Sequence, residues 1–293
     1  MSVALADLNH MALPAFVAAL GDTFEHASWV ADSVHAKRPF DSVTGLHNAM
    51  IGMVRAAPRD SQLAFLRSHP DLAGKAARAG GLTDDSRREQ ASVGLDTLSD
   101  EEFARFHRLN DAYQAKFGFP FIVCVRRHSR DSILRQFERR LDNDAATEFA
   151  AALQEIFYIT RLRLVAKVSG EGVPQVNGRL STHVLDTHAG RPAVGMAIEL
   201  YEYAADRAHR IVTTMTNADG RTDQPLISGR PLPIGRYELR FLVADHFRVR
   251  GIEQGDPPFL DVVPIRFSIA EPEAHYHVPL LCTPWSYSTY RGS

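Results

Sequence analysis

The spacing of apolar residues changes once along this chain, and this change limits the possible folds more than any other feature. Up to about Val168, apolar side chains recur every three or four residues, which is the period of an amphipathic helix. Beyond about Leu180, they recur at every second residue, which is the period of a half-buried strand. Because one element cannot follow both periods, the sequence predicts a helical domain followed by a β domain.

The helical pattern is clearest between residues 99 and 118. This segment opens with Ser99-x-x-Glu102, the pattern of a capping box, and stops at Gly118 before Pro120. Three further segments have the same spacing: Leu46–Val54, Ile133–Leu141 and Phe149–Val168. We therefore expect an all-α helical bundle over residues 1–168.

The β pattern begins after a linker that we place at residues 169–179. The stretch SGEGVPQVNG (169–178) contains neither apolar period and has the composition of an interdomain connection. Alternating apolar residues then follow in three runs: Val194–Leu200, Tyr237–Val243 and Val263–Ile269. Turn residues such as Asp219-Gly220 separate such runs, so we expect an all-β sandwich over residues 180–293.

The charge balance argues against nucleic acid or a membrane as a partner. With 33 Lys and Arg against 35 Asp and Glu, the net charge of -2 leaves no positive excess for a phosphate backbone or an anionic bilayer. No apolar run reaches the roughly 18 residues of a membrane span, and the start MSVALADLNH lacks the pattern of a signal peptide. Only Cys124 and Cys282 are present, which argues against a disulfide framework. We expect a cytoplasmic protein, and the terminal Gly292-Ser293, unlike a peroxisomal signal, agrees with this.

Four motifs mark the second half of the chain: LSTHVLD at 180–186, NADGR at 217–221, HYHVPLL at 275–281 and SYSTYRGS at 286–293. Together they resemble the 5-hydroxyisourate hydrolases, the transthyretin-like enzymes of urate breakdown. The terminal Tyr-Arg-Gly-Ser separates these hydrolases from transthyretin, a hormone carrier of the same fold. The resemblance implies a transthyretin-like all-β sandwich that needs no metal, with site residues at these positions: His183, Arg221 and His277 as catalytic residues, and Tyr290 and Ser293 at the substrate.

The chemistry of such a hydrolase fits these residue types. Opening an acyl-ureide ring requires a base for the attacking water and a positive group for the oxyanion. A neutral imidazole suits the first task, and a planar guanidinium suits the second. We therefore expect His183 and His277 beside the water, Arg221 on the oxyanion and Tyr290 orienting the substrate, with the division between the two histidines left open.

A zinc hydrolase is an alternative for the same half. His275 and His277 are two residues apart on an expected strand, so they share a face and, with His183, form a candidate ligand set. Against this alternative, no Asp, Glu or Cys accompanies them at ligand spacing.

Five motifs mark the first half: RSHPDLAGKAA at 67–77, SRREQ at 86–90, GLDTLSDEE at 94–102, KFGFPFIV at 116–123 and EIFYITRLRL at 155–164. Together they resemble the 2-oxo-4-hydroxy-4-carboxy-5-ureidoimidazoline (OHCU) decarboxylases, which convert the product of the hydrolase into allantoin and CO2. The resemblance implies His69 as the catalytic acid and Glu89 as the key carboxylate. It also implies substrate-binding residues at Pro70, Ser86, Arg87, Arg88, Gln90, Phe121, Ile122, Val123, Cys124, Val125 and one arginine of the Arg161/Arg163 pair, of which Arg163 matches better.

The residues of this half also fit the decarboxylation on physical grounds. Pro70 disfavours helical backbone at His69, so we expect His69 at the mouth of a helix, where a substrate can reach it. Loss of CO2 leaves electrons that the substrate's own conjugated imine can hold, so no cofactor is expected. One alternative concerns Ser86-x-x-Glu89, which alone also has the pattern of a capping box.

Two successive activities in one chain predict a bifunctional enzyme that converts 5-hydroxyisourate through OHCU to (S)-allantoin. The alternative is a decarboxylase that carries a non-catalytic transthyretin-type module for ligand binding and oligomerisation. The resemblance also implies a homo-oligomer, a tetramer built by the second domains, because transthyretin-like hydrolases place their active sites between subunits.

Overall fold

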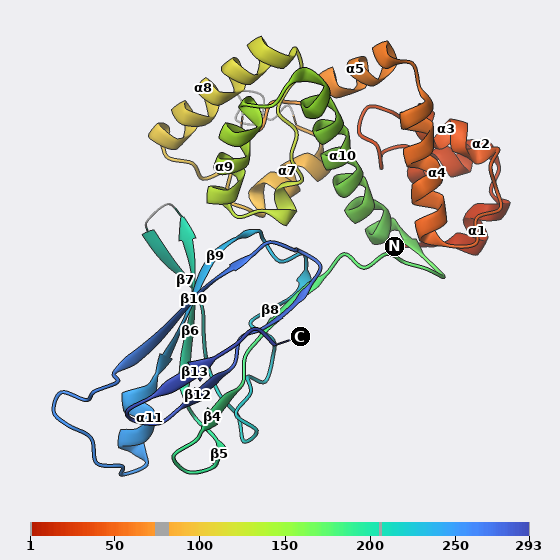
Figure 1. Cartoon of the computed structure of the whole chain (residues 1–293). Helices are drawn as coiled ribbons and strands as arrows, with labels where there is room; N and C mark the ends of the chain where they lie inside the picture. The colour runs from red at the N-terminus through yellow and green to blue at the C-terminus, as the bar shows by residue number, and fades with distance from the viewer. Residues whose placement is uncertain (1, 74–81, 205–206, 293) are drawn as a thin grey trace. The chain divides into compact units, whose positions relative to one another are not determined.

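The structure is a computed structural model that describes residues 2–73, 82–204 and 207–292. It divides into two compact units, a helical unit of residues 1–126 and 133–176 and a sandwich unit of residues 127–132 and 177–293 (Figure 1). The boundary after Val176 lies inside the expected linker. None of the helices in the described ranges is long and apolar enough to cross a membrane.

Residues 127–132 were expected in the helical domain but belong to the sandwich unit. Their backbone is the reason: Ser129 N–H donates to the carbonyl of Ile234, and Ile234 N–H donates to the carbonyl of Arg127 (3.0 and 2.8 Å). Arg127 also pairs with Glu273. Such long-range backbone pairing leaves no signal in local apolar spacing.

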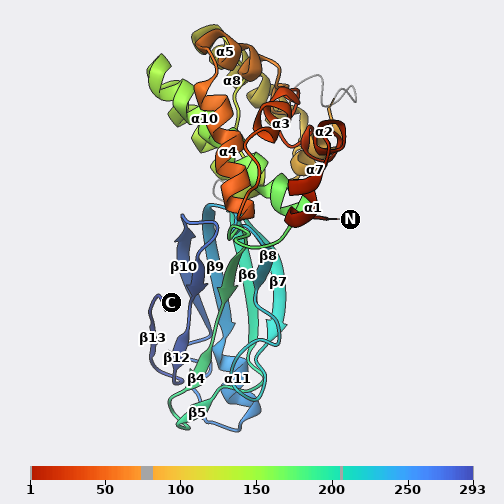
Figure 2. The same cartoon turned by 90° about the vertical axis from the view of Figure 1, so that its right-hand side faces the viewer.

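The helical unit contains these elements in order: β1 (Val3–Ala4), α1 (Leu5–His10), α2 (Leu13–Leu20), α3 (Trp29–His35), α4 (Val43–Ala56), α5 (Arg59–Arg67), α7 (Asp84–Ala91), α8 (Asp100–Phe117), the 3-10 turn Val125–Arg127, α9 (Arg130–Leu141), α10 (Ala145–Lys167) and β2 (Val168–Ser169). Two of these elements cross the unit boundary, since the 3-10 turn and α9 include residues of the 127–132 segment. The long helix α10 runs beside α4 in both views (Figures 1 and 2). The short strand β1 pairs in parallel with β2, which ties the start of the unit to its end.

Local sequence explains where α8 begins and ends. The Ser99 hydroxyl accepts from Glu102 N–H, and the Glu102 carboxylate accepts from Ser99 N–H, so the predicted capping box is confirmed. Gly118 closes the helix at φ 73°, a conformation that favours glycine. On the buried face of α8, Tyr113 packs edge to face against Phe121 and Phe137, with ring centroids 5.3 and 5.8 Å away.

The sandwich unit contains these strands: β3 (Gly178–Ser181), β4 (Val184–Asp186), β5 (Arg191–Pro192), β6 (Ala197–Ala204), β7 (Arg207–Met215), β8 (Ile227–Arg230), β9 (Gly235–Leu242), β10 (Val262–Ile269), β11 (His275–His277), β12 (Leu280–Cys282) and β13 (Tyr287–Thr289). In the described residues they form sheets with the orders β10-β9-β6-β7, β11-β3-β8 and β13-β12-β4-β5. Apolar side chains from all three sheets share one core, as the alternating pattern predicts.

One helix interrupts the β pattern. The alternating run was expected to include Val243, but β9 ends at Leu242 and Val243 opens α11 (Val243–Val249). Val243, Ala244 and Phe247 are all fully buried, so the apolar residues continue there with helical spacing. A single apolar residue at the junction fits both periods, so apolar spacing alone does not separate the end of β9 from the start of α11.

Candidate active sites

A pocket that is open to solvent, with a cavity volume of about 60 Å³, lies in the helical unit beside α7 and α10. Its walls also include His69, Pro70 and Leu72, which follow α5, and residues of the strip 121–125, whose last residue opens the 3-10 turn. The lining residues are Glu25, His69, Pro70, Leu72, Ser86, Glu89, Gln90, Phe121, Ile122, Val123, Val125, Ile159 and Arg163. The fold therefore gathers most of the residues that the first-half motifs suggested.

The charged wall of this cavity is built around Arg163, whose side chain is only 6% exposed. Its guanidinium donates to both carboxylate oxygens of Glu89 (3.0 and 2.8 Å) and to Oε2 of Glu25 (3.2 Å). Burial alone would lower the pKa of Arg163, but the two carboxylates raise it above its usual value. The guanidinium is therefore a permanent positive charge with two anions in contact.

Glu25 is a site residue that the motif analysis did not assign. It lies in the turn after α2 and accepts hydrogen bonds from the hydroxyls of Thr83 (2.6 Å) and Ser86 (2.7 Å). Burial opposes ionisation, yet these hydrogen bonds and the charge of Arg163 lower the pKa of Glu25. The sequence signal for it was the pair Phe24-Glu25, which fits the opening of the OHCU decarboxylases but gave Glu25 no role.

The capping-box alternative for Ser86 and Glu89 is wrong. The N-cap of α7 is Thr83, whose hydroxyl accepts from Ser86 N–H at 3.3 Å. Ser86 is thus inside the first turn, and its hydroxyl donates a hydrogen bond to Glu25, while the carboxylate of Glu89 accepts one from Arg163. Both side chains take part in the cavity wall instead of closing a helix end.

His69 lies just past the C-terminal end of α5, whereas the sequence suggested the opening of a helix. The backbone N–H of His69 donates to the carbonyl of Leu66, and the ring Nδ1 of His69 lies 3.0 Å from the carbonyl of Phe65. These are carbonyls that the last helical turn leaves without a helical partner. Because a carbonyl can only accept, Nδ1 carries the proton, and Nε2 is the nitrogen left for a substrate.

The surroundings of His69 keep its imidazole neutral. Burial lowers its pKa most, and the charge of Arg163 lowers it further. The Phe65 carbonyl and the charge of Glu25 act in the opposite direction but do not offset the burial. His69 therefore presents a bare Nε2 at neutral pH and can take a proton before it gives one back.

The strip 121–125 is held from behind by two helices. Arg140 on α9 donates to the carbonyl of Ile122 at 2.7 Å, and Cys124 N–H donates to Glu155 on α10 at 2.8 Å. The thiol side of Cys124 packs with Leu162 and Val176 in a separate apolar cluster. Cys124 therefore contributes backbone to this region, but its side chain does not line the cavity.

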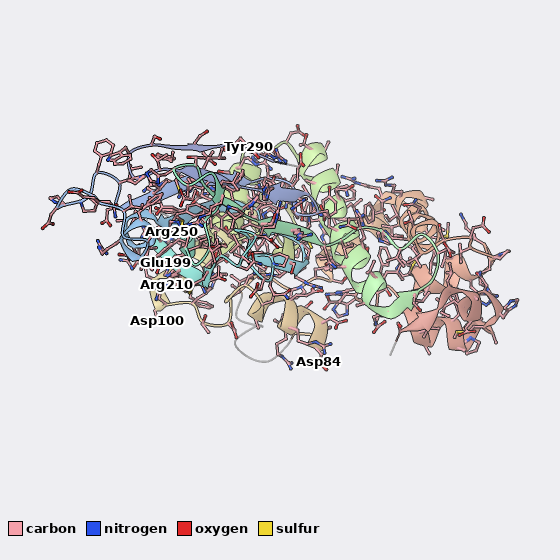
Figure 3. All side chains as sticks on the ribbon, turned by 90° about the horizontal axis from the view of Figure 1, so that it is seen from below. Asp84, Asp100, Glu199, Arg210, Arg250 and Tyr290 are labelled. Carbon is pink, nitrogen blue, oxygen red and sulfur yellow. The ribbon has the colours of Figure 1, made fainter. Side chains whose placement is uncertain are left out.

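Three of the suggested arginines lie outside the cavity lining. Arg87 donates to Asp84, and Arg88 donates to Asp85, each three residues earlier on the exposed face of α7. Figure 3 shows Asp84 pointing away from the protein. Arg161 donates to the carbonyl of Gln175, so of the doubled pair only Arg163 reaches the cavity.

In the sandwich unit, parallel pairing brings two of the motifs together. Strand β3 pairs with β11 in the register Ser181 to His277, and β4 pairs with β12 in the register Val184 to Leu280. Between these pairs, Leu280 N–H donates to the carbonyl of His183 at 2.9 Å. His183 and His277 therefore lie at the same break between the paired strands, although 94 residues separate them.

A turn places Arg221 opposite His183. Arg221 and His183 form an antiparallel bridge, and Gly220 lies in the turn at φ 73°. A Cβ on Gly220 would come within 2.3 Å of the Val184 carbonyl, so only glycine fits there. The positive charge of Arg221 lowers the pKa of both His183 and His277, although burial lowers each pKa more.

The chain end returns to His277. Gly292 N–H donates to the carbonyl of His277 at 2.8 Å, and a Cβ on Gly292 would come within 2.7 Å of the His277 ring. Tyr290, in contrast, is 59% exposed at the outside of the unit (Figure 3). Ser293, the other suggested substrate-binding residue of the tail, lies outside the described residues.

A metal centre was an alternative for the histidines of this unit. In residues 2–73, 82–204 and 207–292, no three His, Cys, Asp or Glu side chains converge into a set that could hold a metal ion. His275 and His277 both lie within hydrogen-bond distance of one serine hydroxyl, that of Ser181.

Comparison with known proteins divides the chain at the same place. Residues 9–165 match the OHCU decarboxylase family, and residues 180–292 match the HIUase/Transthyretin family. A 5-hydroxyisourate hydrolase 2 of Rhizobium meliloti is 55% identical over 117 residues, which are 40% of this chain and 98% of that protein. A 2-oxo-4-hydroxy-4-carboxy-5-ureidoimidazoline decarboxylase of Haloferax volcanii is 42% identical over 167 residues, which are 57% of this chain and 97% of that protein.

One solved structure is similar over both halves. A crystal structure of an (S)-allantoin synthase is 33% identical and aligns with 99% of this chain and 100% of its own, with a TM-score of 0.54. The order of a helical part followed by a transthyretin-like part is therefore shared with a known protein.

The charge of Glu25 raises the pKa of His69, so its removal has a definite sign. We predict that Glu25→Gln lowers the pKa of the His69 imidazole further, because the opposing charge of Arg163 is then less compensated. An NMR titration of the His69 ring checks this, with Glu138→Gln on the exposed face of α9 as a control that leaves the pKa unchanged. A higher His69 pKa in Glu25→Gln would contradict the geometry of the charged wall.

Proposed function

The chain belongs to the OHCU decarboxylase family through residues 9–165 and to the HIUase/Transthyretin family through residues 180–292, and we propose that it catalyses two consecutive steps of urate degradation. The sandwich unit hydrolyses 5-hydroxyisourate to OHCU, and the helical unit decarboxylates OHCU to (S)-allantoin and CO2. The observation that carries this proposal is that each unit has its own cluster of reactive residues.

In the decarboxylation, we assign the proton transfers to His69. Its neutral Nε2 takes a proton from the substrate hydroxyl on the carbon that loses CO2, so that a carbonyl forms there. As CO2 leaves, the electrons of the broken C–C bond reach the carbon of the adjacent C=N group, and the π electrons of that C=N bond pass to its nitrogen, which takes a proton from solvent. The imidazolium then returns a proton to one face of the carbon that becomes the stereocentre, which accounts for a single enantiomer.

Arg163 and Glu89 have complementary roles in this step. The guanidinium of Arg163 is charged at every relevant pH and can attract the substrate carboxylate, although Glu89 and Glu25 already accept from its Nε, Nη1 and Nη2 groups. Glu89 can accept a substrate N–H, and its bond to Arg163 fixes its orientation. The strip 121–125 adds backbone groups for the heterocycle, and Arg140 and Glu155 hold that backbone in place.

In the hydrolysis, His183 and His277 flank the attacking water, and Arg221 faces the oxyanion that forms at the attacked carbonyl. The lowered pKa values leave both imidazoles neutral at pH 7, which is the state in which they can accept a proton from water. Arg221 lowers these values and also supplies the charge that stabilises the oxyanion. Arg221 thus favours both the neutral form of the two imidazoles and the oxyanion intermediate.

The proposal also includes the assembly of the protein. We propose a homo-oligomer, a tetramer formed by the sandwich units. The support is a chain end whose β13 residues are all exposed and whose Trp285, Tyr287 and Tyr290 are 56%, 48% and 59% exposed. Both cysteines are free and buried, which fits a reducing compartment, and we propose the cytoplasm.

Light scattering of the purified protein tests the assembly: we expect a multiple of the 32.5 kDa chain, and a fully active monomer would contradict it.

We predict that His69→Ala stops decarboxylation and leaves hydrolysis near the wild-type rate. The substitution removes the group that transfers the proton, and the hydrolase residues all belong to the other unit. OHCU should then accumulate and decay without enzyme to racemic allantoin. The circular dichroism of (S)-allantoin should therefore be absent from the product. If His69→Ala still forms mainly one enantiomer at the wild-type rate, His69 does not transfer the proton.

We predict that Arg221→Lys lowers hydrolysis by roughly a hundredfold or more, although the charge is kept. An ammonium group cannot reproduce the planar two-donor contact of a guanidinium with the oxyanion. The decay of 5-hydroxyisourate absorbance measures this step, and decarboxylation of supplied OHCU is the control for folding. A rate within a few-fold of wild type would remove Arg221 from the oxyanion site.

A further inference from the structure

Ser181 connects two histidines of the sandwich unit. Its hydroxyl oxygen lies 3.0 Å from Nδ1 of His277 and 2.9 Å from Nε2 of His275. The three side chains thus form a continuous hydrogen-bonded chain from His277 to His275. The proposed hydrolysis gives neither Ser181 nor His275 a role.

Strand geometry explains this arrangement. His275 and His277 are two residues apart on β11, so both side chains lie on one face, and Tyr276 between them is buried on the other. Ser181 pairs with His277 in the parallel register of β3 and β11. The middle member of this hydrogen-bonded chain, Ser181, is buried, whereas His277 at one end is half-buried and His275 at the other end is exposed.

The direction of these hydrogen bonds determines what His277 can do. A serine hydroxyl has one proton, so it donates to one imidazole and accepts from the other. When Ser181 donates to His275, it accepts the Nδ1 proton of His277, and Nε2 of His277 is bare and basic. When the direction is reversed, Nε2 of His277 carries a proton and can donate.

We propose that Ser181 and His275 form a proton relay behind His277 that lets one imidazole act first as base and then as acid in the hydrolysis. This inference rests on the proposed hydrolase function and deepens it. His277 is the catalytic residue in this scheme, Ser181 carries the proton, and His275 stores it.

Each proton in this relay has a defined donor and acceptor. Nε2 of His277 takes a proton from the attacking water as the C–O bond forms; Nδ1–H of His277 passes to Ser181, and the Ser181 proton passes to Nε2 of His275. His275 is then an imidazolium, and His277 is neutral with its proton on Nε2. As the ring C–N bond breaks, His277 gives this proton to the leaving nitrogen, and the relay returns the stored proton to Nδ1.

The two ends of this hydrogen-bonded chain differ in their surroundings. Among the described residues, the charged or titratable groups that act on His277 are Arg221 in the turn, His183 beside β4, Arg179 on β3 and His275 on its own strand, and each of them disfavours a positive charge on His277. Burial has the largest effect in lowering the pKa of His277. His275 is exposed to water, as is its neighbour Arg179, so solvent screens the charge at that end.

The test compares His275→Gln, Ser181→Ala and the double variant. Glutamine can still accept a hydrogen bond from Ser181 but cannot take up a proton. We expect each single variant to lower kcat for the hydrolysis by about tenfold to a hundredfold at its pH plateau, with little change in KM. The double variant should lose no more than the worse single variant, because a relay is broken only once.

The pH profile separates a relay from a purely electrostatic role. If His275 acted only through its charge, His275→Gln would raise the pKa of His277, move the rising limb to higher pH and leave the plateau unchanged. That result, or losses that multiply in the double variant, would overturn the relay. Decarboxylation of supplied OHCU is the folding control, and His209→Gln, an exposed histidine on β7, is the matched variant with wild-type hydrolysis.

The wild-type protein distinguishes failure of the relay from failure of the proposed function. If it does not hydrolyse 5-hydroxyisourate, the proposed function fails and the relay fails with it. If it does, and His275→Gln has the wild-type plateau, only the relay fails.

Discussion

A buried guanidinium must be paired, and much of the helical unit is arranged to satisfy that requirement at Arg163. Its partners come from distant parts of the sequence: Glu25 from the turn after α2 and Glu89 from α7. Removing one partner of a buried ion pair typically costs about 3 to 5 kcal/mol, because the remaining charge is left without compensation. The pairing therefore holds α10, α7 and the turn together, and the same charges form the polar wall of the cavity. Stability and chemistry depend here on the same contacts.

In the sandwich unit, pairing between backbone segments brings the proposed catalytic residues together. Two chain segments, 178–186 and 275–282, run in parallel and are interrupted at the same level. Their interruption leaves His183 and His277 beside each other, and two glycines, Gly220 and Gly292, allow the turn and the chain end to come close. Neutral imidazoles then face a permanent positive charge at Arg221. That combination suits attack of water on a carbonyl.

The sequence predicted the parts of this architecture that depend on local periodicity and on chemically distinctive motifs. The change of apolar period located the two domains, and the capping box at Ser99 located the start of α8. His69, Glu89 and Arg163 were identified by motif, and the fold brings them to one cavity.

Features that depend on contacts between distant segments could not be predicted in this way. Glu25 is separated from Arg163 by 138 residues, and no spacing rule connects them. Thr83 caps α7 in place of Ser86, because the choice depends on where Ser86 finds a second acceptor in Glu25. The relay at Ser181 likewise depends on a parallel register that only the folded chain reveals.

The central claim is that one chain performs both steps. The most direct test adds 5-hydroxyisourate to the purified protein and follows its absorbance together with the circular dichroism of the product. We predict rapid loss of 5-hydroxyisourate and a product that is almost entirely (S)-allantoin, with no accumulation of OHCU. Decay at the rate of the reaction without enzyme, or racemic allantoin, would contradict the account.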